Sequence, residues 1–410
     1  MVPKGWSEHT LDDLALVERG KFSVRPRNDP RYYGGDMPFV QTGDVTSSGT
    51  YLKSFSQTLN ENGIGVSKVF PKNTILITIA ANIGDTAITT FEVACPDSVV
   101  AIQPYKHVAD VYWLKKYLET RKTDLDAQST QNAQKNINLQ VLKPLLILTP
   151  PYAEQKKIAK ILSTWDNAIS VTEKLLANSQ QQKKALMQQL LTGKKRLLDE
   201  NGVRFSGDWN SSKLGDLFNF KKGKGLSKSD LSESGINKCI LYGELYTKYA
   251  EIAYEVISRT NSSDGQLSEP GDILLPASTT TSGIDLANAT ALSEGGILLG
   301  GDINILRPKV RLSSPFLAYF LTHMKKNEIS SRAQGITIIH LYGGDLKSID
   351  IVLPSTVQEQ KKIATVLSAA DAEISTLEKK LACLRDEKKA LMQQLLTGKR
   401  RVKVDEAVTE

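Results

Sequence analysis

The chain has 410 residues, 40% hydrophobic and 24% charged, a composition typical of a folded protein with more than one domain. No apolar run approaches the roughly 20 residues of a membrane helix, so we expect neither a membrane span nor a secretory signal. The net charge is +7, but basic residues exceed acidic ones by only one in 1–150 and balance them in 201–350, so bulk charge does not identify a partner.

The three cysteines are scattered, at Cys95, Cys239 and Cys383, and the four histidines are isolated. This pattern argues against a disulfide framework and against a zinc site. It fits a protein of the reducing cytoplasm, without a metal ion of its own.

Residues 1–150 are predicted to form a first mixed α/β domain. Short β-like runs such as "TILITIA" (74–80) and "SVVAIQP" (98–104) alternate with turn-rich stretches. One helix, near "DVYWLKKYLETR" (110–121), is predicted to follow the last strand.

Basic and aromatic residues gather near the start of this domain, in "RGKFSVRPRNDPRYYGG", and the polar stretch "FVQTGDVTSSGTY" follows. Arginine can bind phosphate or a guanine edge, and polar side chains such as glutamine can contact other base edges. The alternative is a soluble surface loop without a ligand. The predicted DNA-binding residues are Arg19, Lys21, Arg25, Arg27, Arg31, Tyr32, Tyr33, Gln41 and Thr42.

Two short motifs that follow are similar to pieces of catalytic sites. "TPPY", from Thr149 to Tyr152, is similar to the Asn/Asp/Ser-Pro-Pro-aromatic loop of DNA amino-methyltransferases, but threonine is the wrong first residue and no glycine-rich methyl-donor loop accompanies it. The Glu-x-Lys pairs at Glu154 and Glu359 are half of a metal-dependent nuclease signature, without a spaced carboxylate partner. We expect helix-start residues in the first case and solvated charges in the second, and therefore no catalytic site.

Residues 151–197 are predicted to form one long helix. It begins after prolines and ends at Thr-Gly followed by lysine and arginine, which are typical start and stop signals. Nearly 40 residues at 1.5 Å each give a rod of about 60 Å. Apolar residues recur at the heptad spacing of a coiled coil, and the predicted seam consists of Ile158, Leu162, Trp165, Ile169, Leu176, Leu186 and Leu190.

Residues 198–353 are predicted to form a second α/β domain. The β-like runs "DILLPAS" (272–278) and "INILRP" (303–308) precede a helix near "PFLAYFLTHMKK" (315–326). Its basic stretch "FNFKKGKGLSK" begins at the corresponding place in the repeat, and the polar stretch "CILYGELYTKY" follows. The predicted DNA-binding residues are Lys221, Lys222, Lys224, Lys228, Tyr242 and Lys248.

Residues 354–401 are predicted to form a second long helix, followed by a tail, 402–410. Glu154–Arg196 and Glu359–Arg401 align without a gap at an offset of 205, with 28 identities in 43 positions, which indicates a tandem duplication. The second seam consists of Ile363, Leu367, Ile374, Leu377, Leu381, Leu384, Leu391 and Leu395.

Because the two helical copies are so alike, we expect them to pair with each other, antiparallel and with approximate two-fold symmetry. Lys183 and Lys388, at equivalent seam positions, would fix the register or reach acidic groups on a third protein. The alternative is that each helix packs only on its own domain.

The order of domain, "EQKKIA", long helix and "KKALMQQLLTGKKRL", followed by the same pattern again, resembles the specificity subunit of a type I restriction–modification system. The resemblance implies two target-recognition domains, each reading one half of a split sequence in double-stranded DNA. It also implies helices that separate the domains and dock two methyltransferase subunits, and motor–nuclease subunits that complete the complex. S-adenosylmethionine, ATP and Mg²⁺ would then act on those partners, in adenine methylation and DNA cleavage.

The two domains differ strongly in sequence, which predicts an asymmetric target with unlike halves. Two alternatives remain at this point. One is a stand-alone DNA amino-methyltransferase that uses Tyr152, and the other is a coiled-coil scaffold that does not bind DNA.

Overall fold

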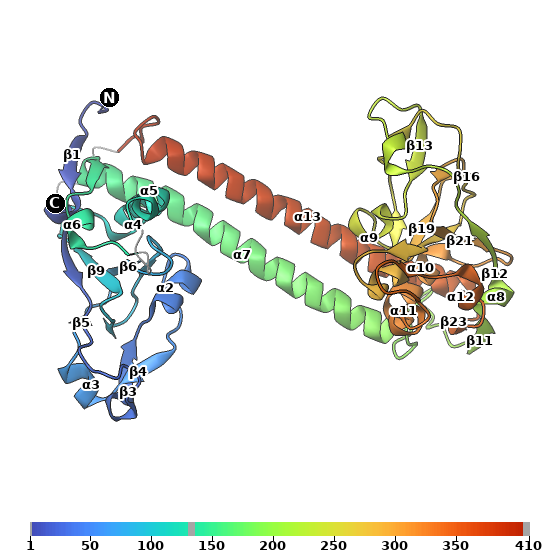
Figure 1. Cartoon of the computed structure of the whole chain (residues 1–410), viewed down its shortest axis with the longest axis horizontal. Helices are drawn as coiled ribbons and strands as arrows, with labels where there is room; N and C mark the ends of the chain where they lie inside the picture. The colour runs from blue at the N-terminus through green and yellow to red at the C-terminus, as the bar shows by residue number, and fades with distance from the viewer. Residues whose placement is uncertain (1, 130–135, 405–410) are drawn as a thin grey trace. The chain divides into compact units, whose positions relative to one another are not determined.

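The computed structural model describes residues 2–129 and 136–404, so the end of the predicted tail, 405–410, lies outside the described residues. The chain divides into two compact units, Met1–Glu173 with Lys380–Glu410, and Lys174–Lys379. Both boundaries fall inside the long helices. Each unit therefore consists of one globular domain and one segment of each long helix (Figure 1).

The globular part of the first unit is a mixed α/β domain, as predicted. Its strands are β1 (Ser7–Thr10), β2 (Ala15–Arg19), β3 (Tyr33–Phe39), β4 (Gln57–Leu59), β5 (Val69–Phe70), β6 (Ile75–Thr78), β7 (Thr86–Ile88), β8 (Val93–Ala94), β9 (Val99–Pro104) and β10 (Leu146–Thr149). Its helices are α1 (Leu11–Leu14), η1 (Pro30–Tyr32), α2 (Thr42–Ser48), α3 (Glu61–Gly65), α4 (Val111–Thr120), α5 (Lys122–Ala127) and α6 (Leu139–Leu142).

Two four-stranded sheets, with the orders β2-β9-β6-β7 and β4-β3-β8-β5, form the centre of this domain. The runs 74–80 and 98–104 form β6 and β9, and α4 lies at the predicted helix. The expectation that this helix follows the last strand is wrong. A further strand, β10, returns to pair antiparallel with β1, because Ser7–Thr10 lies opposite Leu146–Thr149.

The second unit repeats this plan. Its strands are β11 (Trp209–Lys213), β12 (Phe218–Lys222), β13 (Asn237–Ile240), β14 (Ile252–Ala253), β15 (Arg259–Thr260), β16 (Gln266–Leu267), β17 (Ile273–Pro276), β18 (Ser278–Thr279), β19 (Thr290–Leu292), β20 (Leu298–Leu299), β21 (Ile303–Pro308), β22 (Ile339–His340) and β23 (Asp350–Pro354). Its helices are α8 (Leu214–Leu217), η2 (Lys228–Asp230), α9 (Glu244–Thr247), η3 (Gly283–Ala287), α10 (Ser314–Met324), α11 (Lys326–Ser330) and α12 (Gly343–Leu346).

The sheets of the second unit have the orders β12-β21-β17-β19-β14 and β15-β13-β20-β16. The predicted strands and helix are present as β17, β21 and α10. Here too a last strand, β23, pairs antiparallel with the first, β11. In both units the last strand pairs with the first, and this shared feature supports the duplication.

The two long helices are α7 (Tyr152–Leu190) and α13 (Val357–Leu395), each of 39 residues. Both end just before a glycine with a positive φ, Gly193 at 70° and Gly398 at 69°. Since a residue without Cβ adopts this backbone conformation at little cost, these glycines account for the helix ends. The prediction of two long helices is confirmed, and neither they nor any other helix in the described ranges is long and apolar enough to cross a membrane.

In each unit the two long helices run antiparallel. In the first, Asp166 of α7 forms an ion pair with Lys388 of α13, and Glu173 pairs with Arg385. As the residue number rises along α7, the residue number of the contact partner on α13 therefore falls. The same holds in the second unit, where α7 and α13 are joined by Lys183–Asp371 and, just past the end of α7, by Arg196–Glu359. The predicted antiparallel pairing is confirmed within each unit, and the ion pairs follow the tandem duplication, because adding 205 to Asp166 and Lys183 gives Asp371 and Lys388.

Each domain core receives both long helices. Ile158 and Leu162 of α7 are buried in the core of the first unit together with Leu395 of α13, and Leu190 joins Ile363 in the core of the second. The long helices therefore pair with each other and also close the domain cores. Neither pairing alone nor packing on the domains alone describes them completely. The predicted seam residues that are fully buried are Ile158, Leu162, Leu190, Ile363, Leu367, Leu381 and Leu395, and those partly buried are Trp165, Ile169, Leu176, Leu186, Ile374, Leu377, Leu384 and Leu391.

Candidate nucleic-acid interface

The basic loop of the first domain joins β2 to β3. Arg27 forms an ion pair with Asp97 at 2.6 Å, and Arg31 pairs with Asp29 at 2.6 Å. Exposed ion pairs of this kind are worth about 0–1 kcal/mol, so a phosphate group could replace the carboxylates at little cost. All five predicted cations are exposed: Arg19, Lys21, Arg25, Arg27 and Arg31.

The two predicted tyrosines of this loop are half-buried in an aromatic cluster. The Tyr33 ring lies 5.7 Å from that of Phe22 and 6.1 Å from that of Phe39, and Tyr32 packs on the edge of Phe22. Burial raises the pKa of Tyr33, and its hydroxyl donates to the carbonyl oxygen of Arg27. These tyrosines support the loop. The sequence did not predict this role, because their aromatic partners are known only once β3 is placed.

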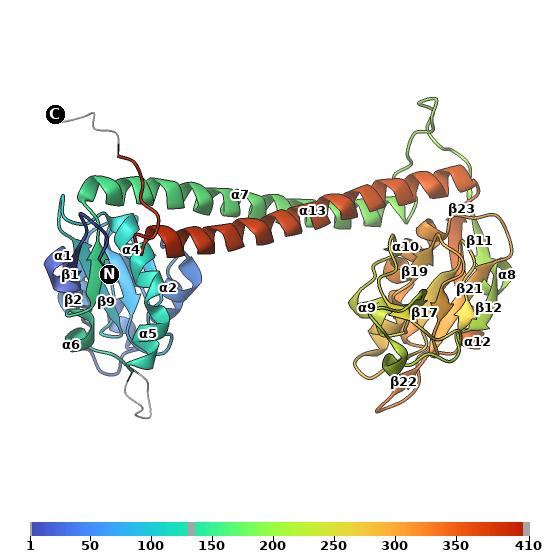
Figure 2. The ribbon, with the colours of Figure 1, turned by 90° about the horizontal axis from the view of Figure 1, so that it is seen from above.

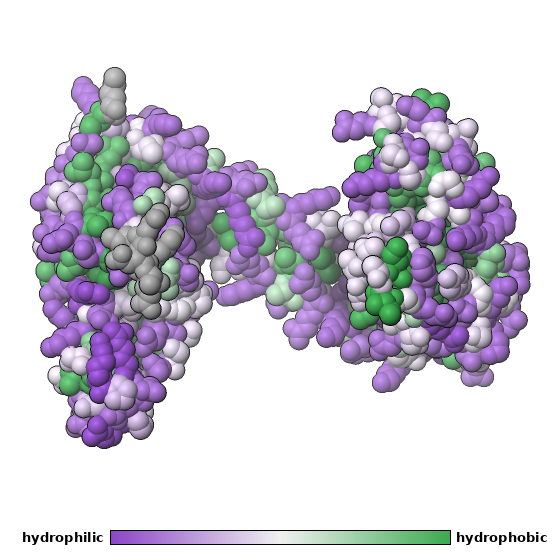
Figure 3. Space-filling view, in the orientation of Figure 1, coloured by the Kyte–Doolittle hydropathy of each residue, from purple (hydrophilic) through white to green (hydrophobic). Residues whose placement is uncertain are grey.

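A hollow of about 470 Å³ opens beside this cluster. Its lining combines an aromatic floor with polar side chains, since Arg27, Gln41 and Gln57 all contribute to it. The Gln41 amide donates to the Gln57 side-chain oxygen at 2.9 Å. Thr42 begins α2 and is half-buried, and it does not line the hollow. The end of the domain formed by β3, β4 and α3 is mostly hydrophilic on the face shown in Figure 3.

Five of the six predicted DNA-binding residues of the second unit line one of two hollows. Lys221 and Lys222 line one of about 230 Å³, whereas Lys228, Tyr242 and Lys248 line another of about 680 Å³. Lys224 lies outside both, at 3.9 Å from an Asp264 oxygen.

The 470 Å³ and 680 Å³ hollows occupy equivalent places in the two domains. Each lies beside the connection from a strand to a short helix, β3 to α2 and β13 to α9. In the first, the Asp44 carboxylate accepts the backbone N–H of Gln41 at 2.8 Å, and in the second Glu244 accepts that of Leu241 at 2.8 Å. Glu244 also pairs with Lys248 at 2.7 Å. The backbone frame is shared while the side chains that reach the hollows differ.

The Glu-x-Lys glutamates are not solvated charges, contrary to expectation. Glu154 is buried and accepts from the Trp6 indole at 3.0 Å and from Arg401, while Glu359 is buried beside Arg196. In each unit the glutamate joins the start of one long helix to the segment after the end of the other. Burial alone would raise the pKa of Glu154, but its hydrogen bonds with Arg401 and Trp6 outweigh this and lower it.

The "TPPY" motif starts the helix, as expected. Thr149 is the last residue of β10, and Tyr152 is the first of α7, with its ring 5.8 Å from that of His107.

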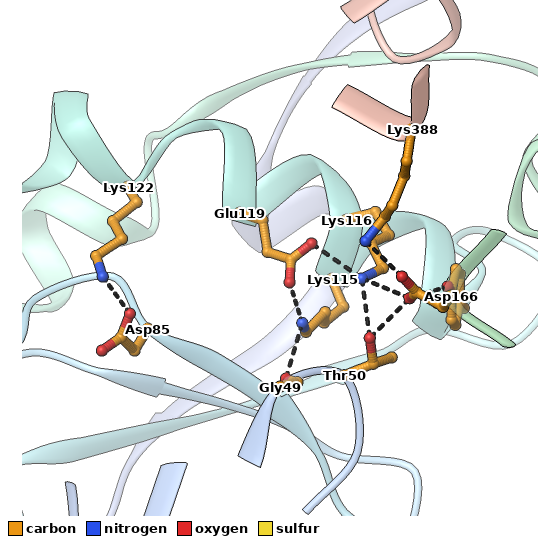
Figure 4. A network of polar contacts seen from close by, with 10 residues as sticks. Gly49, Thr50, Asp85, Lys115, Lys116, Glu119, Lys122, Asp166 and Lys388 are labelled. Atoms are coloured by element: carbon orange, nitrogen blue, oxygen red, sulfur yellow. Dashed lines mark hydrogen bonds and ion pairs between the residues drawn. The ribbon is translucent and has the colours of Figure 1, made fainter. Parts of the chain in front are cut away.

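A partly buried polar network centred on Asp166 joins α7 and α13 to the first domain (Figure 4). Lys116 of α4 donates to the Asp166 carboxylate at 2.8 Å, and Lys388 pairs with it from α13. The hydroxyls of Thr50 and Tyr112 donate to the same carboxylate. In both ribbon views α4 lies beside the first turns of α7 (Figures 1 and 2). The network therefore fixes the long helices against the first domain.

Lys115, next to Lys116, is fully buried on α4 and donates to the Gly49 carbonyl oxygen at 3.0 Å. Its other partner is the Glu119 carboxylate. Burial lowers the pKa of Lys115 to about 8, and the charge of Glu119 offsets this only in part.

The free energy of unfolding is expected to depend on pH through Lys115. Between pH 8 and about 10.5 the unfolded chain still binds the proton that the folded protein has released, so this residue makes stability rise with pH in that window. The wild-type protein should therefore gain about 1–3 kcal/mol relative to Lys115→Met from pH 7.5 to pH 10, measured by urea denaturation. Lys106→Met, at an exposed site, corrects for the loss of one surface charge. If the difference in free energy of unfolding between wild type and Lys115→Met stays constant from pH 7.5 to pH 10, the prediction is contradicted.

The second unit has a simpler version of the network. Lys183 pairs with Asp371, and the Tyr319 hydroxyl donates to the same carboxylate. Lys183 also lies over the Tyr319 ring, 5.8 Å from its centre. The expectation that Lys183 and Lys388 fix the register is supported, because both engage acidic residues of this chain.

Sequence reasoning missed Gln57, Asp166 and Asp371. A signal was available for the two aspartates, because they are identical in the repeat and lie 17 residues before the paired lysines Lys183 and Lys388. No local signal marks Gln57, which reaches its hollow only through the pairing of β4 with β3.

Comparison with known proteins is consistent across the whole chain. The model of the type I restriction modification DNA specificity domain matches residues 3–178 and again 206–384. The type I restriction enzyme MjaVIII specificity subunit of Methanocaldococcus jannaschii is 27% identical over 420 residues, which cover 98% of this chain and 94% of that protein. The putative MjaX specificity subunit of the same organism is 29% identical over 423 residues, 98% and 95% of the two chains.

Solved structures share the fold. The S subunit of a type I restriction–modification system from M. genitalium superimposes with a TM-score of 0.61 at 18% identity, covering 95% of this chain and 96% of that one. The HsdS subunit from Thermoanaerobacter tengcongensis does so with a TM-score of 0.50 at 17% identity, covering 97% and 98%. The specificity-domain model matches this chain twice, and the two matches together cover more than half of the chain. The chain therefore belongs to the type I restriction–modification DNA specificity family.

Proposed function

We propose that this chain is the DNA-recognition subunit of a type I restriction–modification complex in the cytoplasm. Each domain reads one half of an asymmetric bipartite target in double-stranded DNA. The helix pair sets the distance between the two readers and docks two methyltransferase subunits. Adenine methylation with S-adenosylmethionine, and cleavage with ATP and Mg²⁺, belong to the methyltransferase and motor–nuclease partners, so this chain is not itself an enzyme.

One observation carries the proposal: the specificity domain occurs twice, and each copy opens a hollow at the same place with different polar side chains in its lining. Amides and an arginine line the first hollow, and lysines and tyrosines line the second. Since base edges are distinguished by their donors and acceptors, unlike linings favour unlike half-sites. The exposed basic residues beside them supply phosphate contacts that position the domains.

The proposal is tested by co-expressing the chain with the methyltransferase subunits of its own system and mapping methylated bases by sequencing. We expect methylation at one asymmetric sequence with two specified halves. Exchange of residues 1–150 for the corresponding part of a relative should change one half only. The purified chain alone, mixed with DNA and a labelled methyl donor, should incorporate no label, and incorporation there would contradict the assignment.

A further inference from the structure

We infer that Gln41 and Gln57 of the first domain form an adenine-reading pair, an inference that rests on the proposed function. The two side chains come from separate segments, Gln41 from the connection between β3 and α2 and Gln57 from the start of β4. Antiparallel pairing of β3 with β4 places Phe39 opposite Gln57 and so brings the two amides to one edge of the hollow.

The bond between the amides decides which groups they present. Gln41 Nε2 donates to Gln57 Oε1 at 2.9 Å. Each glutamine carries one carbonyl oxygen and one NH₂ group, so Gln41 keeps its oxygen to accept and Gln57 keeps its nitrogen to donate. Turning both amides over leaves the same combination, with the roles exchanged. The pair thus presents one acceptor beside one donor in either orientation.

Both segments are held by a single carboxylate. Asp44 accepts the backbone N–H of Gln41 at 2.8 Å and the hydroxyl of Ser56, the neighbour of Gln57, at 3.0 Å. The hollow beside them measures about 470 Å³ and also includes Arg27, one of the exposed cations of the loop. The two segments that carry the amides are therefore positioned before any ligand binds, next to a group that can contact phosphate.

This pattern matches one base in the major groove. Adenine presents a donor at N6 beside an acceptor at N7, whereas guanine presents two acceptors, thymine an acceptor and a methyl group, and cytosine a donor. The acceptor of the pair suits adenine N6 and the donor suits N7. The residues that line the counterpart hollow of the second unit include no asparagine or glutamine. The inferred reader accordingly belongs to the first half-site alone.

The experiment uses the full chain with its methyltransferase subunits and duplexes of the mapped target. Each adenine in the half read by residues 1–150 is replaced in turn by 7-deazaadenine, which lacks the N7 acceptor. One replacement should weaken binding by about tenfold to a hundredfold in competition gel shifts.

Two variants of the chain separate base reading from a merely structural role. Gln57→Glu keeps an acceptor for Gln41 but turns the outward donor into an acceptor, so it should show the same loss on the natural duplex and no further loss on the 7-deazaadenine duplex. Gln128→Ala, an exposed amide on the end of α5, should behave as wild type. A urea unfolding transition of the first unit that matches wild type shows that Gln57→Glu is folded.

A first half-site without adenine, tolerance of every 7-deazaadenine, or an unchanged response of Gln57→Glu to the analogue would each overturn the inference. A wild-type complex that methylates no defined sequence contradicts the proposed function itself, and this inference with it. The two failures are thus distinguishable by the methylation map.

Discussion

Lengthening both long helices by one heptad is expected to lengthen the unspecified gap in the DNA target by about three base pairs. Seven residues add about 10 Å to a helix, and successive base pairs are about 3.4 Å apart. The insertions belong after Ala177 in α7 and after Leu377 in α13, near one level of the pair, because Ser179 contacts Glu373 and Lys183 pairs with Asp371 just beyond. A full heptad keeps the seam in phase in both helices. Mapping methylated bases measures the gap.

Two controls accompany this paired insertion. Seven residues inserted at Gly202, in an exposed turn between α7 and β11, should leave the gap unchanged. An insertion in α7 alone moves Lys183 away from Asp371. It should lower both the free energy of unfolding of the chain and the methylation activity of the complex. If the paired insertion leaves the gap at its original length, the helices do not set the spacing.

Replacing Asp166 by alanine is expected to lower the free energy of unfolding of the first unit by about 2–4 kcal/mol, because Lys116 loses one of its two carboxylate partners and keeps only Glu119, at 3.1 Å. The change removes the carboxylate from Lys116, whose side chain is only 1% exposed, and from Lys388. Burial disfavours the Asp166 carboxylate, but Lys116 and the hydrogen bonds from Lys388 and Tyr112 outweigh it and hold the pKa well below its usual range. The contribution is therefore complete above about pH 4 and is lost only as the pH falls further.

The repeat supplies the matched control. Asp371→Ala removes the equivalent carboxylate in the second unit, where Lys183 is 16% exposed and His323, four residues after Tyr319 as Lys116 is after Tyr112, pairs with Glu251. The loss should therefore be about 1–2 kcal/mol. Adding Lys116→Met to Asp166→Ala should recover part of the larger loss, since it removes a buried charge that has kept only Glu119 as its ionic partner. Urea denaturation monitored by circular dichroism measures all four proteins. Equal losses at the two aspartates would contradict the assigned role of Lys116.

The duplication, the two long helices and their pairing were predictable because their signals are local. Helix periodicity, the prolines at the helix starts and the glycines at Gly193 and Gly398 act over a few residues, and an offset of 205 needs only the sequence compared with itself. The strands β6, β9, β17 and β21 were predictable for the same reason, being short apolar runs bounded by turns.

Long-range pairing decided what surrounds each charged side chain, and this the sequence by itself did not reveal. Glu154 has the pattern of an exposed first-turn residue, yet Arg401, 247 positions away, buries and pairs with it. Lys116 lies on a helix of ordinary amphipathic pattern, and only the packing of α7 and α13 beside α4 brings Asp166 and Lys388 to it. The Gln41–Gln57 pair likewise exists because β4 lies antiparallel to β3. A residue type limits the hydrogen bonds that a side chain can form, and the fold determines which partners lie within reach.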